Sequence, residues 1–503
     1  MSTLRELLNA VPGAQLLGEA DPEIRSLAYD SRRVERGGLF VCITGHNLDG
    51  HQFIAEAVKQ GAVALVGTDA AALAAAPASL GRAVVTDARS ALGLLAAEFY
   101  EYPSEELLLI GVTGTNGKTT TCHLIAAALR EAGKKPGIIG TLGTISDRGY
   151  VPSERTTPEA LDLQAQFSDY LEAGIDAVVM EASSHSLALR RIEGCAFDVG
   201  VFTNLTQDHL DFHPTLEDYF AAKALLFTDY AERSAVDKPF GAVINVDDEY
   251  GRKLAQMCQF PVVTYGVESE ANVVAEGIEI TPQGATFVVR TATSRTQVKL
   301  KLTGRFNVYN ALAAFGVGEL KGLDTETICR GLESVPPPPG RFEMIHEGQD
   351  FSVCVDYAHT PDGLVNVITT AREFTGGRLI VVFGCGGDRD RTKRPQMGAV
   401  ASSFADICVV TSDNPRSEEP EAIIQDIVAG ASQGHAELVV EPDREAAIRR
   451  ALKLARRGDF VLLAGKGHET YQQFKDKIIA FDDREVARAA LREVMVTRAD
   501  ELA

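Results

Sequence analysis

The stretch Gly111-Val-Thr-Gly-Thr-Asn-Gly-Lys-Thr-Thr120 decides the fold of the middle of this chain, because it is typical of a turn between a buried strand and a helix. An apolar run over 107–112 leads into it, and a helical pattern over 121–130 follows. Glycines let backbone N–H groups face phosphate oxygens, and Lys118 supplies a mobile ammonium. Thr119 is placed to ligate Mg²⁺. We therefore expect a phosphate-binding loop.

The loop departs from the strict Walker pattern, which requires a glycine at position 112, where this chain has valine. Gly114 supplies the glycine instead, so the loop is a variant. A glycine-rich turn that binds no ligand is the alternative. The Gly-Lys-Thr-Thr ending and the strand–helix context argue against that alternative.

Two further apolar strands end in residues that suit a phosphate site. Residues 177–180 lead into Glu181, and residues 199–202 are followed by Asp208 and His209. An acid at the mouth of a buried strand beside a phosphate loop usually serves Mg²⁺. Taken alone, Glu181 could equally be a helix N-cap and His209 a structural residue. Their joint appearance after the loop favours both as site residues.

The chain is too long for one hydrophobic core, and its composition suggests three units, at 1–103, 104–336 and 337–503. The proline-rich stretch 335–340 is expected to act as a stiff tether. In the last unit, strands are expected over 379–383, 407–410 and 460–464, and helices over 421–430 and 444–457. This alternation predicts doubly wound α/β domains.

Composition argues against several classes of protein. The net charge of −21 disfavours nonspecific binding to nucleic acid or anionic lipid. No apolar run approaches the ~18 residues that a membrane span requires. Residues 1–6 lack the pattern of a secretory signal, so a cytoplasmic location without membrane insertion is expected. The eight cysteines form no CxxC pair, which argues against a zinc ribbon or a disulfide framework.

Ordered motifs along the whole chain resemble those of the Mur ligase family. After the phosphate loop come MEASSH at 180–185, NLTQDHLDFH at 204–213, GRFNVYNALAA at 304–314, VDYAHTPDGL at 355–364, GCGGDRDRTKRP at 384–395 and AGKGHE at 464–469. DSRRVERGGLF at 30–40 and GHNLDGH at 45–51 look like the family's UDP-sugar-binding segments. The resemblance implies a UDP-sugar-binding N-terminal domain, a central P-loop ATPase domain and a C-terminal Rossmann-like domain.

The resemblance also implies the reaction. ATP phosphorylates a substrate carboxylate, and an amine attacks the acyl phosphate to give an amide, ADP and phosphate. The protein must mainly position the groups and spread their negative charge. ATP and Mg²⁺ are therefore the expected cofactors, and the implied catalytic residues are Lys118, Glu181, His209 and Lys223.

By resemblance, ATP is bound by Gly114, Thr115, Asn116, Gly117, Lys118, Thr119, Thr120, Asn307, Arg341 and Asp356, with Asn310 completing the asparagine motif. Alternatives stay open for three residues on this side. Asn307 could be a helix cap, and Arg341 could form a surface ion pair at the hinge. His359 could bind nucleotide or cap the loop before a proline.

Lys223 matches the lysine that is carbamylated in this family. The implied metal ligands are Thr119, Glu181, His209 and Lys223 as the carbamate formed with CO₂. An ammonium beside Mg²⁺ would be repelled, whereas a carbamate is an oxygen ligand. An unmodified surface lysine is the alternative.

For a UDP-N-acetylmuramoyl dipeptide, the resemblance points to Ser31, His46, Asn47, Leu48, Thr156, Thr157, Ser183 and Arg191. Hydroxyls supply short donors, and Arg191 supplies a fork for a carboxylate. Some members carry glutamine two residues before this arginine, where this chain has Leu189. Ser31 could also start a turn or cap a helix.

The segment Asp413-Asn-Pro-Arg416 resembles the signature of the diaminopimelate-adding members of the family. The full set implied for this amino acid is Arg394, Asp413, Asn414, Pro415, Arg416, Gly465 and Glu469. Meso-diaminopimelate has a carboxylate at the end where lysine has only an ammonium, and a guanidinium can clamp it. The alternative is a turn in which Arg416 pairs with Glu418 or Glu419.

These residues together predict an enzyme that joins meso-diaminopimelate to the γ-carboxylate of D-glutamate in UDP-N-acetylmuramoyl-L-alanyl-D-glutamate. A monomer that closes around its substrates is expected, since the phosphate loop and the Asp-Asn-Pro-Arg segment lie in different units. A lysine-adding or folate-directed sibling is one rival, and a nucleotide switch without ligase activity is another. Arg416 argues against the sibling, and the retained acceptor residues argue against the switch.

Overall fold

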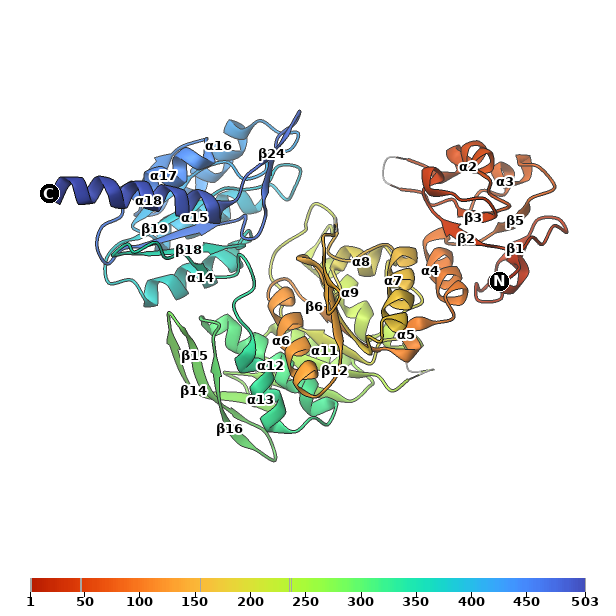
Figure 1. Cartoon of the computed structure of the whole chain (residues 1–503), viewed down its shortest axis with the longest axis horizontal. Helices are drawn as coiled ribbons and strands as arrows, with labels where there is room; N and C mark the ends of the chain where they lie inside the picture. Colours follow the sequence, from red (N-terminus) through yellow and green to blue (C-terminus); the bar gives the residue numbers. More distant parts are fainter. Residues whose placement is uncertain (1, 46–47, 154, 235, 237, 503) are drawn as a thin grey trace.

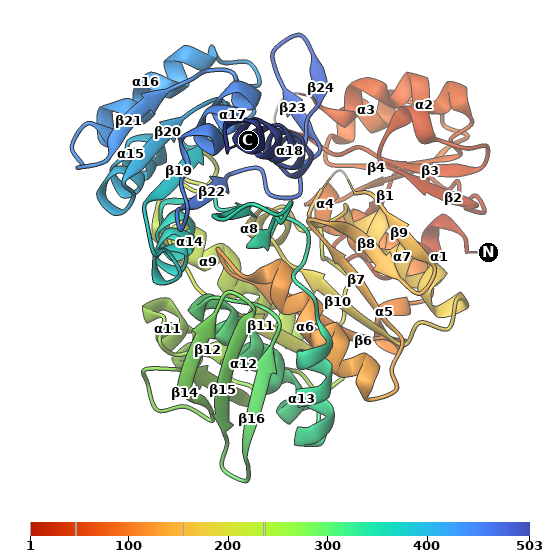
Figure 2. The same cartoon turned by 60° about the vertical axis from the view of Figure 1, so that its left-hand side comes forward.

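The computed structural model describes residues 2–45, 48–153, 155–234, 236 and 238–502, with side chains as far as residue 495. Three large sheets organise the chain. The body that holds the central sheet lies between the other two in Figure 1 and below both of them in the view of Figure 2. The predicted three-domain α/β architecture is confirmed. None of the helices in these ranges is long and apolar enough to cross a bilayer.

The N-terminal body holds a five-stranded sheet of order β1-β5-β4-β3-β2, in which β1 is antiparallel to β5 and the other pairs are parallel. Its strands are β1 (Gln15–Leu16), β2 (Ser26–Ala28), β3 (Gly38–Val41), β4 (Ala64–Gly67) and β5 (Gly81–Val84). Its helices are α1 (Leu4–Leu8), α2 (Ile54–Gln60), α3 (Ala70–Ala75) and α4 (Ala88–Phe99), with the 3-10 helices η1 (Ser31–Arg33) and η2 (Gly50–Phe53). Helix α4 packs against α7 of the central body.

The central body is built on an eleven-stranded sheet of order β16-β15-β14-β13-β12-β11-β6-β10-β7-β8-β9. Its strands are β6 (Leu108–Thr113), β7 (Pro136–Gly140), β8 (Gly143–Ser146), β9 (Gly149–Val151), β10 (Ala177–Glu181), β11 (Val199–Phe202), β12 (Gly241–Asn245), β13 (Val262–Gly266), β14 (Val273–Thr281), β15 (Gly284–Arg290) and β16 (Arg295–Leu300). Its helices are α5 (Pro103–Glu106), α6 (Lys118–Glu131), α7 (Ala160–Glu172), α8 (Ser184–Ala188), α9 (Leu216–Ala224), α10 (Asp229–Ser234), α11 (Glu249–Met257), α12 (Arg305–Leu320) and α13 (Thr325–Ser334), with the 3-10 helix η3 (Leu225–Phe227).

Strand β6 lies in the middle of the central sheet, with β10 on one side and β11 on the other, and all three run parallel. Separate apolar cores cover the two faces of the sheet, which is why these strands are continuous apolar runs. Because β6, β10 and β11 are parallel neighbours, their carboxyl ends meet at one edge of the sheet, where such folds bind ligands.

The antiparallel extension β14–β16 was not predicted from the sequence. Strand β14 pairs parallel with β13 but antiparallel with β15, and β15 pairs antiparallel with β16. The inner residues of these strands, such as Phe287 and Val298, are buried in the same core as α12 and α13. The extension therefore lengthens the sheet and covers one face of the ATPase body.

The C-terminal body holds a six-stranded sheet of order β17-β18-β22-β19-β20-β21, parallel except for β17. Its strands are β17 (Glu343–Met344), β18 (Ser352–Asp356), β19 (Leu379–Phe383), β20 (Ile407–Val410), β21 (Glu437–Val440) and β22 (Phe460–Ala464), and a hairpin of β23 (Tyr471–Gln473) and β24 (Ile478–Ala480) stands apart. Its helices are α14 (Pro361–Glu373), α15 (Lys393–Phe404), α16 (Pro420–Ala431), α17 (Arg444–Leu454) and α18 (Asp483–Leu502). Helix α17 was expected to reach 457, but it ends at Leu454 because Ala455 takes an extended conformation.

Candidate functional site

The phosphate loop connects β6 to α6, which begins directly at Lys118. A Cβ atom on Gly114 would lie 1.9 Å from the Thr203 hydroxyl oxygen, and one on Gly117 would lie 2.3 Å from Asn310 Oδ1. Both glycines also have positive φ angles, +147° and +85°. Glycine is therefore required at 114 by the approach of the chain after β11, which accounts for the variant position of the loop glycine.

Lys118 folds back over the loop. Its Nζ donates hydrogen bonds to the carbonyl oxygens of Gly114 and Thr115, both at 2.8 Å. Burial lowers the pKa of Lys118 from its ordinary value. The ammonium lies at the mouth of the loop, where it can turn from carbonyl oxygens to phosphate oxygens.

Glu181 ends β10 and is buried, with 1% of its surface exposed. It accepts hydrogen bonds from Thr119 Oγ1 at 2.8 Å and from the backbone N of Thr141 at 2.9 Å. The N-cap of the following helix is Ser183, not Glu181, so the helix-cap alternative is wrong. Within the described part of the chain, Glu181 has no ion pair. A buried carboxylate with neutral hydrogen-bond partners suits a divalent cation.

His209 lies in a cluster of rings at the other side of the loop. Its ring centroid is 4.8 Å from that of His185, and its Nε2 is 3.3 Å from Asp208 Oδ2. Burial lowers the pKa of His209 to about 3, so its imidazole is neutral at neutral pH. A neutral imidazole can ligate a metal or accept a hydrogen bond. The backbone of His209 has φ +57°, a conformation that is uncommon outside glycine.

Lys223 lies on α9 with 1% of its surface exposed, so the surface-lysine alternative is wrong. Its Nζ donates a hydrogen bond to the Gly114 carbonyl oxygen at 2.8 Å and lies 4.4 Å from the centre of the Tyr219 ring. Burial, reinforced by the Lys118 charge, holds the pKa of Lys223 well below its ordinary value. A lowered pKa favours the neutral amine, which is the form that reacts with CO₂.

Next to the loop lies a cavity of about 470 Å³ that is lined by both the central and the C-terminal body. Among its lining residues are Thr115, Asn116, Gly117, Lys118, Thr119, Thr120, Glu181, His209, Asn310, Arg341, Asp356 and His359. Thr156 and Ser183, predicted for the UDP-linked substrate, also line it. The structure thus brings the predicted nucleotide residues together with part of the predicted acyl-substrate set.

Asn307 and Asn310 lie on α12. Asn310 Nδ2 donates to Asn307 Oδ1 at 2.9 Å, and Asn307 Nδ2 donates to the Thr303 carbonyl oxygen. The N-cap residue of α12 is Gly304, so Asn307 does not cap the helix start. Asn307 faces a second cavity of about 590 Å³ at the hinge, which it shares with Arg341.

Arg341 reaches from the hinge into the central body. Its Nη2 donates to Thr119 Oγ1 at 3.2 Å, and its guanidinium lies 4.5 Å from the centre of the Tyr357 ring. The described residues offer Arg341 no carboxylate partner, which excludes the surface ion pair. Asp356 is buried and accepts from the backbone N of Phe342 and Ala358, and burial raises its pKa.

His359 does not cap the helix that follows it, since the N-cap of α14 is Thr360. Its Nδ1 lies 2.8 Å from the Tyr357 carbonyl oxygen, and its Nε2 lies 3.9 Å from Asp208. Burial lowers the pKa of His359 to about 4. The Nδ1 contact is local to the loop, as the loop-cap alternative expects, and the ring also lies against the central body.

Direct contacts join the central and C-terminal bodies beside this cavity. Asn116 Nδ2 donates to Asp362 Oδ2 at 3.1 Å, and Lys393 Nζ lies 3.3 Å from Asp208 Oδ1 with both side chains buried. The Lys393 charge counteracts the effect of burial and holds the pKa of Asp208 below its ordinary value. Sequence reasoning missed Lys393, because nothing local to its helix indicates a partner in another body.

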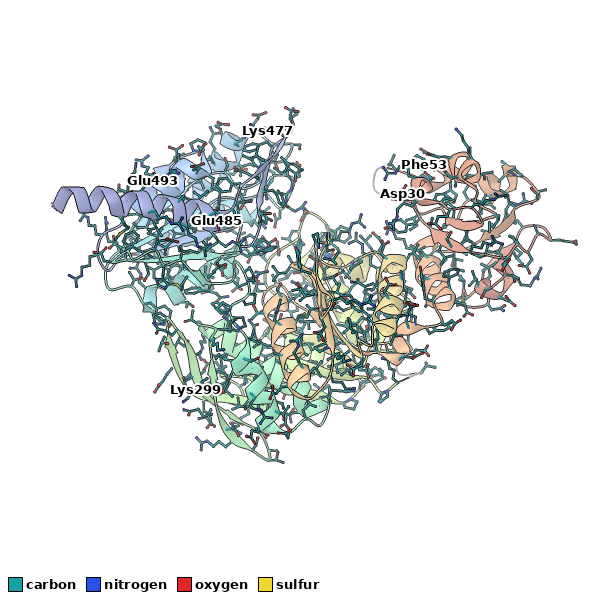
Figure 3. The ribbon with its side chains drawn as sticks, in the orientation of Figure 1. Asp30, Phe53, Lys299, Lys477, Glu485 and Glu493 are labelled. Atoms are coloured by element: carbon teal, nitrogen blue, oxygen red, sulfur yellow. The ribbon has the colours of Figure 1, made fainter. Side chains whose placement is uncertain are left out.

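The residues predicted for the UDP-linked substrate fall into two groups. Thr156, Thr157 and Ser183 lie beside Glu181: Thr157 Oγ1 donates to the Glu181 carbonyl oxygen at 2.8 Å. Ser31 lies in the N-terminal body, where its hydroxyl donates to Glu56; Asp30, labelled in Figure 3, caps the short helix η1.

The other residues predicted for this substrate differ in their surroundings. Arg191 forms an ion pair with Glu159, its Nε 3.0 Å from Glu159 Oε1. Leu48 is 63% exposed. Leu189 is the C-cap of α8 and contributes no polar side chain. His46 and Asn47 lie outside the described residues.

The predicted amino-acid site is assembled from the loops after β20 and β22. A Cβ atom on Gly465 would lie 2.7 Å from Asp413 Oδ2, and Asn414 Nδ2 donates to Glu469 Oε2 at 2.8 Å. Burial, reinforced by the Asp413 charge, raises the pKa of Glu469. The structure therefore places Asp413, Asn414 and Glu469 on adjoining loops, where the buried ammonium of Lys466 lies 2.9 Å from Glu469 Oε2 and 3.2 Å from Asn414 Oδ1.

Arg416 lies at the end of this segment, after Pro415, with φ +53°. Its Nη1 donates to the Gly387 carbonyl oxygen at 2.7 Å. Residues 415–418 do form a turn, in which the backbone N of Glu418 donates to the Pro415 carbonyl oxygen at 3.1 Å. The ion pairs of the described chain include none between Arg416 and Glu418 or Glu419, so the pairing expected in the turn alternative is not observed.

The structure does not support the predicted role of Arg394. Its side chain has no exposed surface, and its guanidinium pairs with Glu418 at 2.8 Å and with Asp426 at 3.0 Å. The Arg394 guanidinium, which was predicted to bind a substrate carboxylate, is therefore bound to these two protein carboxylates instead. Arg389 has no ion pair among the described residues, and a Cβ on Gly386 would lie 3.8 Å from Arg389 Cγ and 2.8 Å from Arg416 Nη1.

Comparisons with known proteins agree with this geometry. Residues 112–318 match the Mur ligase middle domain, residues 340–467 the glutamate ligase domain of Mur ligases, and residues 23–100 the catalytic domain of the Mur ligase family. The chain is 50% identical over 493 residues to the UDP-N-acetylmuramoyl-L-alanyl-D-glutamate–2,6-diaminopimelate ligase of Geobacillus thermodenitrificans, covering 97% of this chain and 99% of that protein. It is 44% identical over 496 residues to a ligase of the same name, numbered 1, from Clostridium acetobutylicum, covering 98% and 99%.

Solved structures give the same picture. A structure of a UDP-N-acetylmuramoyl-L-alanyl-D-glutamate–2,6-diaminopimelate ligase matches with a TM-score of 0.64 and 33% identity, over 93% of this chain and 95% of that one. MurF from Acinetobacter baumannii shares the fold at 20% identity, with a TM-score of 0.67 over 98% of this chain and 99% of that one. The chain belongs to the Mur ligase family.

Proposed function

We propose that this protein is the ATP-dependent ligase that joins meso-diaminopimelate to the γ-carboxylate of D-glutamate in UDP-N-acetylmuramoyl-L-alanyl-D-glutamate. The observation that carries the proposal is the acceptor site on the loops after β20 and β22, where Asp413, Glu469 and Arg416 all lie near enough to Tyr471 to shift its pKa. Meso-diaminopimelate presents an ammonium and a carboxylate at its far end, so it needs acids and an arginine together. Lysine would leave the arginine unpaired.

The reaction needs a phosphate donor, an acid and an amine in one place. The γ-phosphoryl group of ATP passes to a carboxylate oxygen, which forms an acyl phosphate and ADP. The amine then attacks the acyl carbon, phosphate leaves, and the nitrogen loses a proton to give the amide. Lys118 and Arg341 lie where they can spread the charge of the phosphoryl group, since both border the cavity beside the loop.

Magnesium fits the residues around the loop. Thr119 and Glu181 would hold it, with His209 nearby, and the buried carboxylate of Glu181 supplies the negative charge. The described residues contain no cluster of three or more His, Cys, Asp or Glu side chains able to hold a metal. This composition suits Mg²⁺, which usually retains water and phosphate ligands. When bound, the ion supplies charge stabilisation to the transferred phosphoryl group.

Carbamylation of Lys223 is part of the proposal. A buried ammonium next to Lys118 is electrostatically unfavourable, and the lowered pKa of Lys223 supports a neutral, nucleophilic amine. The amine nitrogen would attack the carbon of CO₂ and lose a proton, which would replace the neutral amine by a carbamate anion that can attract Lys118 or the metal. A mass measurement of the intact protein, prepared and kept at neutral pH, tests this modification.

The UDP-linked substrate would extend from the cavity to the N-terminal body. We assign its peptide end to Thr156, Thr157, Ser183 and Arg191 and its uridine end to Ser31, His46, Asn47 and Leu48. Arg191 would exchange Glu159 for the substrate carboxylate. The amino acid would be held by Arg389, Asp413, Asn414, Pro415, Arg416, Gly465 and Glu469, with Arg389 in the place first expected of Arg394.

We further propose domain limits at 103/104 and 336/337, a monomeric enzyme and a cytoplasmic location, where ATP and UDP-linked precursors are available. The central and C-terminal bodies already touch through Asn116 and Asp362. Closure of the C-terminal body over the cavity would bring the amine to the acyl phosphate.

An ADP-release assay tests the proposal directly. Release must require both the UDP-linked dipeptide and meso-diaminopimelate, and mass spectrometry must find the tripeptide product. Release with lysine at equal efficiency would assign the chain to a sibling reaction. ATP hydrolysis that no amino acid stimulates would indicate a nucleotide switch and overturn the proposal.

A further inference from the structure

Arg444 and Asp483 form a buried ion pair behind the acceptor loops. Neither side chain has exposed surface. The contact is bidentate: Nε lies 2.8 Å from Asp483 Oδ1, and Nη2 lies 2.7 Å from Oδ2. Arg444 is the first residue of α17 and Asp483 is the first residue of α18, so the pair joins the starts of two helices. The proposed reaction assigns no task to either residue.

The same guanidinium also bridges two strand ends. Its Nη1 donates to the Ser412 carbonyl oxygen at 3.2 Å, and its Nη2 donates to the Ala464 carbonyl oxygen at 3.0 Å. Ser412 immediately precedes Asp413, and Ala464 immediately precedes Gly465. Arg444 therefore contacts the backbone of both segments at the point where each enters the acceptor site.

The two bridged segments have no direct strand pairing. Strand β19 lies between β20 and β22 in the sheet, so no backbone ladder fixes the distance between the loops that follow the outer two strands. Side-chain contacts across that gap, such as the one from Asn414 to Glu469, belong to the pocket itself. Arg444 connects the two loops from the side opposite the acceptor residues, because its planar guanidinium can bind two carbonyl oxygens and a carboxylate at once.

Charge adds to the geometric argument. Burial lowers the pKa of Arg444, but Asp483 and then Asp413 and Glu469 outweigh it and raise that pKa. The acceptor acids are thus near enough to interact with the buried cation.

We propose that Arg444, held by Asp483, is a positioning residue that sets the spacing of the two acceptor loops and thereby the affinity and selectivity for the amino-acid substrate. The inference rests on the proposed function, because that function defines the acceptor site. A buried ion pair alone would be weak evidence of purpose. Here the Arg444 guanidinium also donates hydrogen bonds to the backbone carbonyl oxygens of Ser412 and Ala464, which directly precede the acceptor residues.

The test is the variant Arg444→Lys, measured in the full-length enzyme with all three substrates. An ammonium keeps the charge but cannot hold Asp483, Ser412 and Ala464 in one plane. We expect KM for meso-diaminopimelate to rise at least about tenfold, because misplacement of a binding group by about 1 Å is costly. KM for ATP and for the UDP-linked dipeptide should stay within about twofold, and the preference over lysine should fall.

Arg378→Lys is the matched control. Arg378 pairs with Asp459 at 2.7 Å, and the two residues directly precede β19 and β22, at the opposite end of the same sheet. This variant should lower the unfolding temperature of the protein and leave all three KM values unchanged. If Arg444→Lys behaves like the control, or shifts the three KM values equally, Arg444 is merely structural and the inference is wrong.

Two further measurements keep the outcome clear. If Arg444→Lys does not fold, Asp483→Asn replaces it, since the amide keeps the shape of the carboxylate; the same KM should then rise about threefold or more. Wild-type enzyme without diaminopimelate-dependent ADP release would refute the proposed function itself. Active wild type with an unaltered Asp483→Asn variant would refute only the positioning role.

Discussion

The phosphate loop and the acceptor site are built by different means. The loop is a continuous segment in which glycine is required at 114 and 117 by positive φ angles and by the close side-chain oxygens of Thr203 and Asn310. The acceptor site combines loops after two strands that do not pair, and its charged side chains depend on neighbours far away in the chain. A site made by local backbone geometry can therefore be recognised from its residue types. A site made by converging side chains can be recognised only once the fold is known.

The largest expected effect concerns the loop. Lys118→Ala should reduce ADP release by about 10³-fold or more, because the ammonium is the mobile cation that meets the phosphates. Steady-state assays with saturating amino acid measure this loss. Lys134→Ala is the control, since Lys134 follows the same helix and forms only an exposed pair with Asp176. Retention of more than about a tenth of the activity by Lys118→Ala would contradict the role.

The next effect separates metal binding from packing at Glu181. Glu181→Gln keeps a hydrogen-bond acceptor for Thr119 but removes the buried charge, so the Mg²⁺ concentration for half-maximal rate should rise about 10²-fold. A titration of activity against Mg²⁺ measures the shift. An unchanged Mg²⁺ dependence together with a lower unfolding temperature would assign Glu181 to structure.

Arg416 and Arg394 provide a sharp comparison within the acceptor region. Arg416→Ala should raise KM for meso-diaminopimelate by about 10²-fold and erase its advantage over lysine, because a charge-assisted clamp is lost. Arg394→Ala should instead destabilise the protein by about 1–3 kcal/mol, since Glu418 and Asp426 lose their partner. Thermal unfolding and kinetics on both variants distinguish the two roles. Equal KM effects would restore Arg394 as a substrate ligand.

The smallest expected effect is a pH dependence at the acceptor site. Burial and the Asp413 charge raise the pKa of Glu469, so this carboxylate takes up a proton at a higher pH than an ordinary glutamate. The substrate ammonium prefers the ionised form, and KM for the amino acid should therefore rise several-fold as the pH falls from about 7 to about 5. In Glu469→Gln this acidic limb should be absent. A limb that persists unchanged would assign it to another group.

Much of the fold could be predicted from the sequence. The strands before the phosphate loop and in the last unit could be recognised from their own residues, because strands that are covered on both faces carry continuous apolar runs. The extension β14–β16 escaped prediction, since its place at the sheet edge depends on pairing with β13. The end of α17 at Leu454 also differs from the end predicted at 457, because the helical pattern of the sequence continues past the last helical residue.

The sequence by itself determined the phosphate loop, the carboxylate after β10, the buried lysine on α9 as a candidate and the family. These depend on residue types within short segments, where sterics and hydrogen bonding act between near neighbours. Only the tertiary structure decided that Arg394 is engaged by Glu418 and Asp426, that Arg389 lies beside Arg416, and that Arg444 connects two loops. The reason is physical: a charged side chain takes the partner that the fold brings nearest, and distance along the chain does not reveal which partner that is.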